Sequence, residues 1–155
     1  MSFTKFNTLP EPEEAFIPLR EEQLAILEAQ VESEQPVATV QSQFNFAWGL
    51  IKSKDDDDVK QGINLMTEIF KTVPSRRKEC IYYLALACFK MKEYQEATRY
   101  ITTLLQHQPS NAQALSLQKM INNELAKDSL IGFAIISTAV AAGAGLASYF
   151  FKRKK

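Results

Sequence analysis

The chain has 155 residues, of which 46% are hydrophobic, and it carries 18 basic and 18 acidic side chains with a single histidine. The zero formal charge hides an asymmetry, because all the acidic residues precede residue 129 whereas four of the basic residues end the sequence. The preceding part therefore holds 14 basic against 18 acidic residues, a net charge of −4. This balance excludes a broad basic surface for nucleic acid.

The N-terminal segment "MSFTKFNTLPEPEE" has no basic region followed by an apolar stretch and no Arg-rich amphipathic pattern. Neither a secretory signal nor a mitochondrial matrix presequence is therefore expected. Pro10 and Pro12 keep the segment from forming a long helix, so residues 1–13 are predicted to be a flexible arm. The arm and its continuation carry four large apolar side chains, which are Phe3, Phe6, Leu9 and Phe16.

Two segments within residues 41–109 match each other after a shift of about 35 residues. Small residues recur, with Gly62 matching Ala97, and a proline recurs at Pro74 and Pro109. Small residues allow two helices to approach closely, and proline ends the second helix. The pattern is typical of two tetratricopeptide repeats, each a helix, a tight turn and an antiparallel helix.

Two repeats alone would expose an apolar face at each end, and the flanking segments supply covers. Apolar residues recur at helical spacing on both flanks: Leu19, Leu24, Leu27 and Val31 before the repeats, and Ala114, Leu117, Ile121 and Leu125 after them. The predicted fold is therefore all-α, a six-helix tetratricopeptide-like bundle in a cytosolic domain over residues 14–128.

Residues 130–151 form an uncharged run of 22 residues. As a helix, the run would be about 33 Å long, which matches the hydrocarbon core of a bilayer. We expect a transmembrane tail-anchor over residues 129–151, inserted into the lipid bilayer after translation. A basic targeting tip follows it, formed by Lys152, Arg153, Lys154 and Lys155.

The two cysteines, Cys80 and Cys88, cannot pair with each other, because eight residues along one helix separate their Cα atoms by about 12 Å. Packing is the expected role of both. His107 has no companion pattern for catalysis or for zinc. No glycine-rich phosphate loop is present either, so we expect no catalytic residues, no metal, no cofactor and no enzymatic activity.

Two charged runs have ordinary structural explanations. Residues 55–58 are four aspartates, but Lys60 and Met66 stand where a calcium loop needs glycine and glutamate, so a solvated turn is predicted. Residues 76–78 are basic and begin a helix, where positive charge is unfavourable to the helix dipole. Pairing with nearby acids is favoured over binding of a partner.

The first helices of the two repeats line the concave surface of such a bundle. The spacing predicts eight side chains there: Gln43, Phe46, Leu50, Ser53, Glu79, Tyr82, Leu86 and Phe89. Five of them are large and apolar, so a groove for an amphipathic helix or an extended apolar segment is predicted. The alternative is that the chain's own arm covers the groove, and we hypothesise that the arm competes with a partner for it.

The stretches "SRRKECIYYLALACFKMKEYQEATRYI" and "FNFAWGLIKS", with the C-terminal apolar run, resemble the mitochondrial fission 1 protein family in its fungal form. The resemblance implies an adaptor on the mitochondrial outer membrane and on peroxisomes, with its helical domain in the cytosol. By the same resemblance it recruits a dynamin-related GTPase, directly or through a WD-repeat adaptor with a coiled coil. The implied docking surface is Phe46, Leu50, Tyr82, Leu86 and Phe89, shaped by the arm; self-association is left open.

Two other functions remain as alternatives. A chaperone-docking or precursor-import receptor can also be tail-anchored and tetratricopeptide-based, but it needs cationic and amide side chains where Phe46 and Leu50 stand. A protein that perturbs membranes through its own helix would use residues 130–151 as more than an anchor. Replacing that run with an unrelated tail-anchor separates such a protein from an adaptor.

Overall fold

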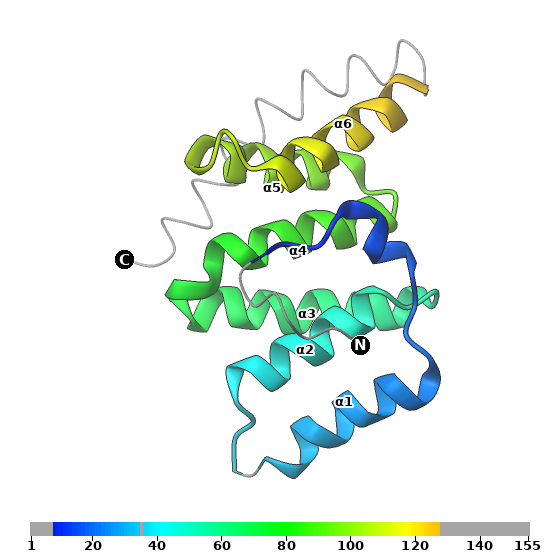
Figure 1. Cartoon of the computed structure of the whole chain (residues 1–155), viewed down its shortest axis with the longest axis vertical. Helices are drawn as coiled ribbons and strands as arrows, with labels where there is room; N and C mark the ends of the chain where they lie inside the picture. The colour runs from blue at the N-terminus through cyan, green and yellow to red at the C-terminus, as the bar shows by residue number, and fades with distance from the viewer. Residues whose placement is uncertain (1–7, 35, 128–155) are drawn as a thin grey trace.

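The computed structural model describes residues 8–34 and 36–127, which contain helices and no strand. In chain order the elements are the 3-10 helix η1 (Pro12–Phe16), α1 (Glu21–Ser33), α2 (Val40–Ile51), α3 (Asp56–Thr72), the 3-10 helix η2 (Pro74–Arg76), α4 (Arg77–Lys90), α5 (Tyr94–His107) and α6 (Ala112–Lys127). Figure 1 shows them stacked from α1 at one end to α6 at the other, with successive α-helices antiparallel. The predicted six-helix, all-α bundle is confirmed for this part of the chain.

The helix pairs α2–α3 and α4–α5 form the two predicted repeats. Gly62 lies where α3 crosses α2: a Cβ atom there would come within 2.8 Å of the Ala47 carbonyl oxygen and of Ile51 Cγ1. Gly49 likewise allows α2 to approach α1 closely, because a Cβ atom there would lie 3.0 Å from Leu27 Cδ1 and 3.1 Å from Leu24 Cδ1. The small residues of the repeat pattern therefore mark close helix contacts.

The four aspartates begin α3, where the sequence predicted only a solvated turn. Asp55 is the N-cap, and its Oδ1 accepts a hydrogen bond from the Asp57 amide at 2.8 Å. The other three occupy the first turn, where negative charge interacts favourably with the helix dipole. Among the described residues, no group of three metal-binding side chains is present.

α4 is the centre of the core, and every residue from Cys80 to Phe89 is buried. It packs against α3 and α5 on its flanks, and η1 and α6 also contact it. Cys80 and Cys88 are both buried and free, as predicted, and burial raises the pKa of each thiol to about 12. A helix enclosed in this way needs apolar residues all round.

α1 packs on α2 as the first layer of the stack and is tied to it by Glu34. The Glu34 carboxylate accepts hydrogen bonds from Gln30 Nε2 at 2.7 Å, from the Thr39 amide at 2.8 Å and from Ser42 Oγ at 2.8 Å. These bonds, first among them that from Gln30, lower the pKa of Glu34 to about 2.

No helix in the described part of the chain is long and apolar enough to cross a bilayer. The predicted span at residues 130–151 lies outside the described residues, as do the basic tip at Lys152, Arg153, Lys154 and Lys155 and the arm residues Phe3 and Phe6. The predicted boundary between arm and domain, after residue 13, falls within η1.

Candidate functional site

The five residues predicted to line the concave groove are buried. Their exposed fractions are 7% for Phe46, 3% for Leu50, 0% for Tyr82 and Leu86, and 8% for Phe89. The three polar positions predicted beside them, Gln43, Ser53 and Glu79, are half-buried. Tyr82, Leu86 and Phe89 belong to one core cluster, whereas Phe46 and Leu50 are buried outside that cluster. In the described structure the five do not form an open apolar surface.

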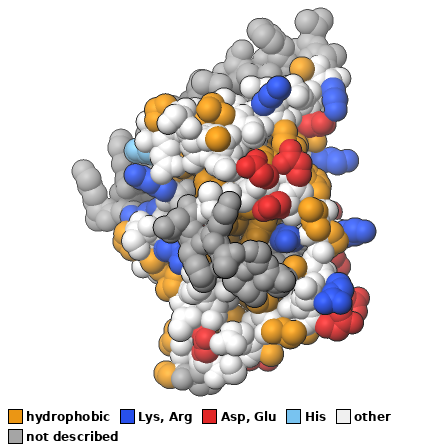
Figure 2. All heavy atoms as spheres, in the orientation of Figure 1, with side chains coloured by type: hydrophobic (Ala, Val, Ile, Leu, Met, Phe, Trp, Pro, Cys, Tyr) orange, Lys and Arg blue, Asp and Glu red, His pale blue; other side chains and the backbone are white. Residues whose placement is uncertain are grey.

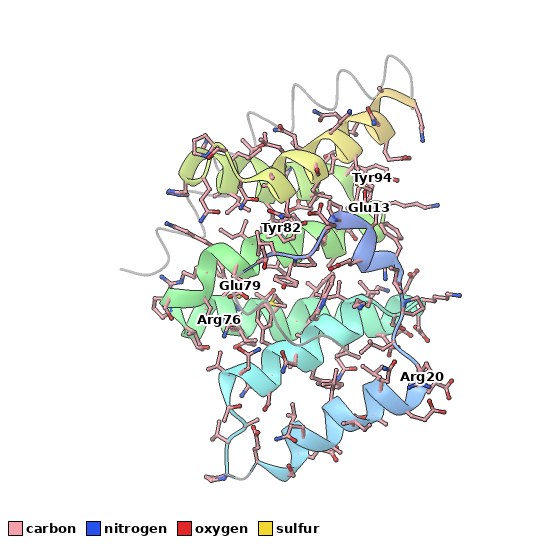
Figure 3. The ribbon with its side chains drawn as sticks, in the orientation of Figure 1. Glu13, Arg20, Arg76, Glu79, Tyr82 and Tyr94 are labelled. Atoms are coloured by element: carbon pink, nitrogen blue, oxygen red, sulfur yellow. The ribbon has the colours of Figure 1, made fainter. Side chains whose placement is uncertain are left out.

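The described part of the arm lies along α4 and is held by Tyr82. The Tyr82 hydroxyl donates a hydrogen bond to the Pro10 carbonyl oxygen at 2.6 Å. Burial raises the pKa of this hydroxyl well above its usual range, and Glu11 contributes in the same direction. Figure 3 shows Tyr82 on α4 beside the arm. The hydroxyl therefore acts as a neutral donor that fixes the arm on the concave face.

η1 continues the cover toward the C-terminal end of α4. Pro12 and Ala15 are buried, and Leu9 packs half-buried against the core. The Phe16 ring meets the Phe89 ring edge to face, with centroids 5.9 Å apart, although Phe16 itself remains 50% exposed. Of the predicted arm residues that the structure describes, Leu9 and Phe16 thus both contact the bundle.

Lys90, the last residue of α4, contacts both α2 and the arm at this end of the site. Its Nζ donates to the carbonyl oxygens of Ile51 at 2.6 Å and Ser53 at 2.7 Å, and so caps the end of α2. The Phe16 ring centroid lies 5.8 Å from the same Nζ, within the range of a cation–π contact. Burial lowers the pKa of Lys90 to about 8. Lys90 therefore links α4, the end of α2 and the arm.

The other end of the site is polar. Arg76 donates to Glu79 at 2.8 Å and lies over the Phe44 ring, with its guanidinium carbon 4.5 Å from the centroid. The local acid pairing predicted for the basic run is thus present. Arg77, the next residue, caps α3 by donating to the Phe70 carbonyl at 2.9 Å. Figure 3 shows Arg76 and Glu79 at the opposite end of α4 from Tyr94.

A notch of about 410 Å³ opens between the arm, the start of α4 and the α5–α6 connection. Its lining is mainly polar and includes Thr8, Ser75, Lys78, Gln108 and Gln113. Gln113 Nε2 also donates to Glu11 Oε1 at 3.3 Å, which ties the arm to α6. Figure 2 shows several acidic side chains near the middle of the face that it views. Glu11, Glu13 and Glu14 of the arm are exposed.

Several residues of this site were not predicted. Pro10 and Pro12 were treated as helix breakers, whereas Pro10 supplies the acceptor for Tyr82 and Pro12 is buried. Lys90 was not singled out at all. A lysine at the end of an apolar helix is a weak signal for carbonyl capping, since its partners lie 39 and 37 positions away.

Comparison with known proteins identifies relatives that share this architecture. The model of the Fis1 N-terminal tetratricopeptide repeat matches residues 41–73, and that of the Fis1 C-terminal tetratricopeptide repeat matches residues 78–130. The chain is 42% identical over 153 residues to the mitochondrial fission 1 protein of Saccharomyces cerevisiae, a match covering 98% of this chain and 99% of that protein. The chain belongs to the mitochondrial fission 1 protein family.

Solved structures of this family share the fold. Yeast Fis1 in complex with an Mdv1 fragment containing N-terminal extension and coiled coil domains has a TM-score of 0.77 and 45% identity, over 81% of this chain and 100% of that one. Yeast Fis1 complexed with a fragment of yeast Caf4 has a TM-score of 0.58 and 49% identity, over 61% of this chain and 97% of that one. The resemblance to the mitochondrial fission 1 family seen in the sequence is confirmed.

Proposed function

We propose that this chain is a non-enzymatic adaptor of mitochondrial fission, which binds a coiled-coil adaptor and through it recruits a dynamin-related GTPase. The observation that supports this most directly is the 45% identity to yeast Fis1, a protein crystallised with a coiled-coil-containing Mdv1 fragment. An adaptor contributes location and effective concentration, since anchoring one partner to a surface confines weak contacts. Constriction and GTP hydrolysis then belong to the recruited machinery.

The proposed location is the mitochondrial outer membrane, with residues 14–128 in the cytosol, and also the peroxisomal membrane. The predicted anchor at residues 129–151 and the family relationship support the location. Fluorescence microscopy of the chain tagged at its N-terminus, with and without residues 129–155, tests it. Organelle labelling that survives removal of these residues would contradict the anchor.

The partner is proposed to bind a composite surface formed by the seated arm and the groove beneath it. Tyr82 and Phe89, which contact Pro10 and Phe16, then act mainly as the floor that positions the arm, whereas Phe46, Leu50 and Leu86 are buried within the bundle. Phe16 and Ile17 are 50% and 60% exposed, so the seated arm itself presents apolar area to a partner. Exposed apolar side chains beside a polar rim are typical of docking surfaces.

Binding on the arm avoids the free energy of removing it. A partner that needed the buried floor would first have to break the Tyr82–Pro10 hydrogen bond and expose Pro12, Ala15 and Phe89. Its apparent affinity would equal the intrinsic affinity multiplied by the fraction of molecules in which the arm is detached. The composite surface needs no such step, which is why we favour it.

Truncation of one exposed arm residue tests this surface. The affinity of the full chain for a coiled-coil adaptor fragment like that crystallised with yeast Fis1 is measured by titration calorimetry. We expect Phe16→Ala to weaken binding about fivefold or more, as loss of an aromatic anchor does. The matched control is Ile26→Ala, because Ile26 is 67% exposed but lies on α1. Unchanged or tighter binding by Phe16→Ala would contradict the composite surface.

A further inference from the structure

Lys90 lies where the end of α4, the end of α2 and the arm meet. Its Nζ donates to the carbonyl oxygens of Ile51 at 2.6 Å and Ser53 at 2.7 Å, and the Phe16 ring centroid lies 5.8 Å from the same atom. Phe16 in turn packs edge to face on Phe89, which precedes Lys90 in the chain. One side-chain nitrogen therefore makes two contacts within the bundle and one with the arm.

The contacts of Lys90 suit a neutral amine as well as an ammonium group. An ammonium group has three N–H donors, whereas a neutral amine has two N–H donors and a lone pair. The two carbonyls of α2 use two donors, so loss of one proton keeps both hydrogen bonds and frees a lone pair. Lys90 is half-buried, so its Nζ stays within reach of a small reagent. This geometry allows the side chain to act as a nucleophile.

The surroundings of Lys90 favour the neutral form. Burial, the largest influence, lowers its pKa from 10.5 to about 8, and the charge of Lys52 acts in the same direction, against that of Asp56. At about pH 7.5, roughly a quarter of a group with this pKa is neutral, compared with about one in a thousand for an ordinary lysine. A lower pKa also weakens a nucleophile, which offsets part of the gain.

We propose that Lys90 is a site of acylation by acyl thioesters, and that its acylation loosens the arm. The neutral Nζ attacks the carbonyl carbon of the thioester, a C–N bond forms, the C–S bond breaks and a thiolate leaves. Nζ loses one proton, which the thiolate takes up. The products are an amide on Lys90 and a free thiol, so the step needs neither an oxidant nor a reductant.

Acylation removes the contact between Lys90 and the arm. The amide nitrogen carries no charge, so the cation–π contact with the Phe16 ring is lost. The nitrogen also keeps a single N–H, so one of the two carbonyls at the end of α2 loses its donor. Loss of a cation–π contact at a partly exposed site corresponds to an increase of about threefold in the ratio of detached to seated arm.

Acetylation of the full chain tests the site. The chain, in detergent micelles at about pH 7.5, is treated with acetyl-coenzyme A, and the acetylated fraction of each lysine is followed over time by mass spectrometry of peptides. Lys54 is the matched control, since it lies exposed just beyond the end of α2. We expect Lys90 to be acetylated about fivefold faster than Lys54, or more. Equal or slower acetylation of Lys90 would overturn the proposal.

Amide hydrogen exchange measures the effect on the arm. The wild type is treated until Lys90 is fully acetylated, and Lys90→Arg is treated for the same time, so acetylation of the other lysines is common to both. The Ile17 amide, which donates to Glu14 at 3.2 Å, should exchange about threefold faster after treatment in the wild type and at an unchanged rate in Lys90→Arg. The Val73 amide, which donates to Ile69 at 2.9 Å, should not respond in either chain. Equal responses of the Ile17 amide in the two chains, or an equal rise at Val73, would contradict loosening of the arm by acylation.

Discussion

Replacement of Tyr82 by phenylalanine should loosen the arm without disturbing the core. The substitution keeps the buried ring and removes only the hydroxyl that donates to Pro10 at 2.6 Å. Pro10 is half-buried, so its carbonyl can be solvated once the arm detaches. A hydrogen bond of this kind contributes about 1 kcal/mol, which corresponds to an approximately fivefold change in the ratio of detached to seated arm.

Amide hydrogen exchange measures this ratio directly. Within η1, the Glu14 amide donates to the Glu11 carbonyl at 3.0 Å and the Ile17 amide to the Glu14 carbonyl at 3.2 Å, and both should exchange when the arm detaches. We expect them to exchange about fivefold faster in Tyr82→Phe. The control is Tyr83→Phe, whose ring packs between Phe44 and Trp48.

The reasoning would be refuted by exchange in η1 that is unchanged in Tyr82→Phe, or that rises equally in Tyr83→Phe. The first result would mean that burial of Pro12 and Ala15 alone holds the arm. The second would mean that any loss of a hydroxyl in α4 loosens the whole bundle.

Three further predictions concern stability, measured by denaturant unfolding. Gly62→Ala should destabilise the fold by about 1–2 kcal/mol, because a Cβ atom would lie 2.8 Å from both the Ala47 carbonyl and Ile51; no loss would mean that α2 and α3 can separate. Asp55→Ala should cost about 1 kcal/mol by removing the cap of α3, and Asp55→Asn should retain most of it. The wild type's free energy of unfolding minus that of Lys90→Met should rise as pH increases from about 8 toward 10.5. In this range the unfolded state binds more protons at Lys90 than the folded state does. A difference that stays flat or falls would contradict a lowered pKa of Lys90 in the folded state.

Much of the fold follows from local signals in the sequence. The match of Gly62 with Ala97 marks helix crossings that the structure contains, because a close approach excludes larger side chains whatever surrounds it. The basic run at the start of α4 was expected to pair with nearby acids, and Arg76 does so with Glu79 three residues later. The first prediction needs only the repeat of small residues along the chain, and the second needs only an acid three residues from Arg76.

The position of the arm could not be obtained in this way. Tyr82 and Pro10 are 72 positions apart, and the arm has no periodicity that would indicate which face of the bundle it contacts. An apolar stripe such as Tyr82, Leu86 and Phe89 on α4 looks the same in sequence whether a partner or the chain's own arm covers it. The aspartates at 55–58 were ambiguous for a related reason, since aspartate favours both turns and helix N-termini.

The seated arm also determines how affinity should respond to mutation. If a partner must displace the arm, each ~1.4 kcal/mol that holds the arm in place would lower that partner's affinity about tenfold, because only molecules with a detached arm can bind it. In that case Tyr82→Phe would raise the detached fraction about fivefold and tighten binding by the same factor. A partner that binds on the arm gains nothing from detachment, so Tyr82→Phe should leave its affinity equal or weaker. The exposed positions of Phe16 and Ile17 on the seated arm favour the second outcome.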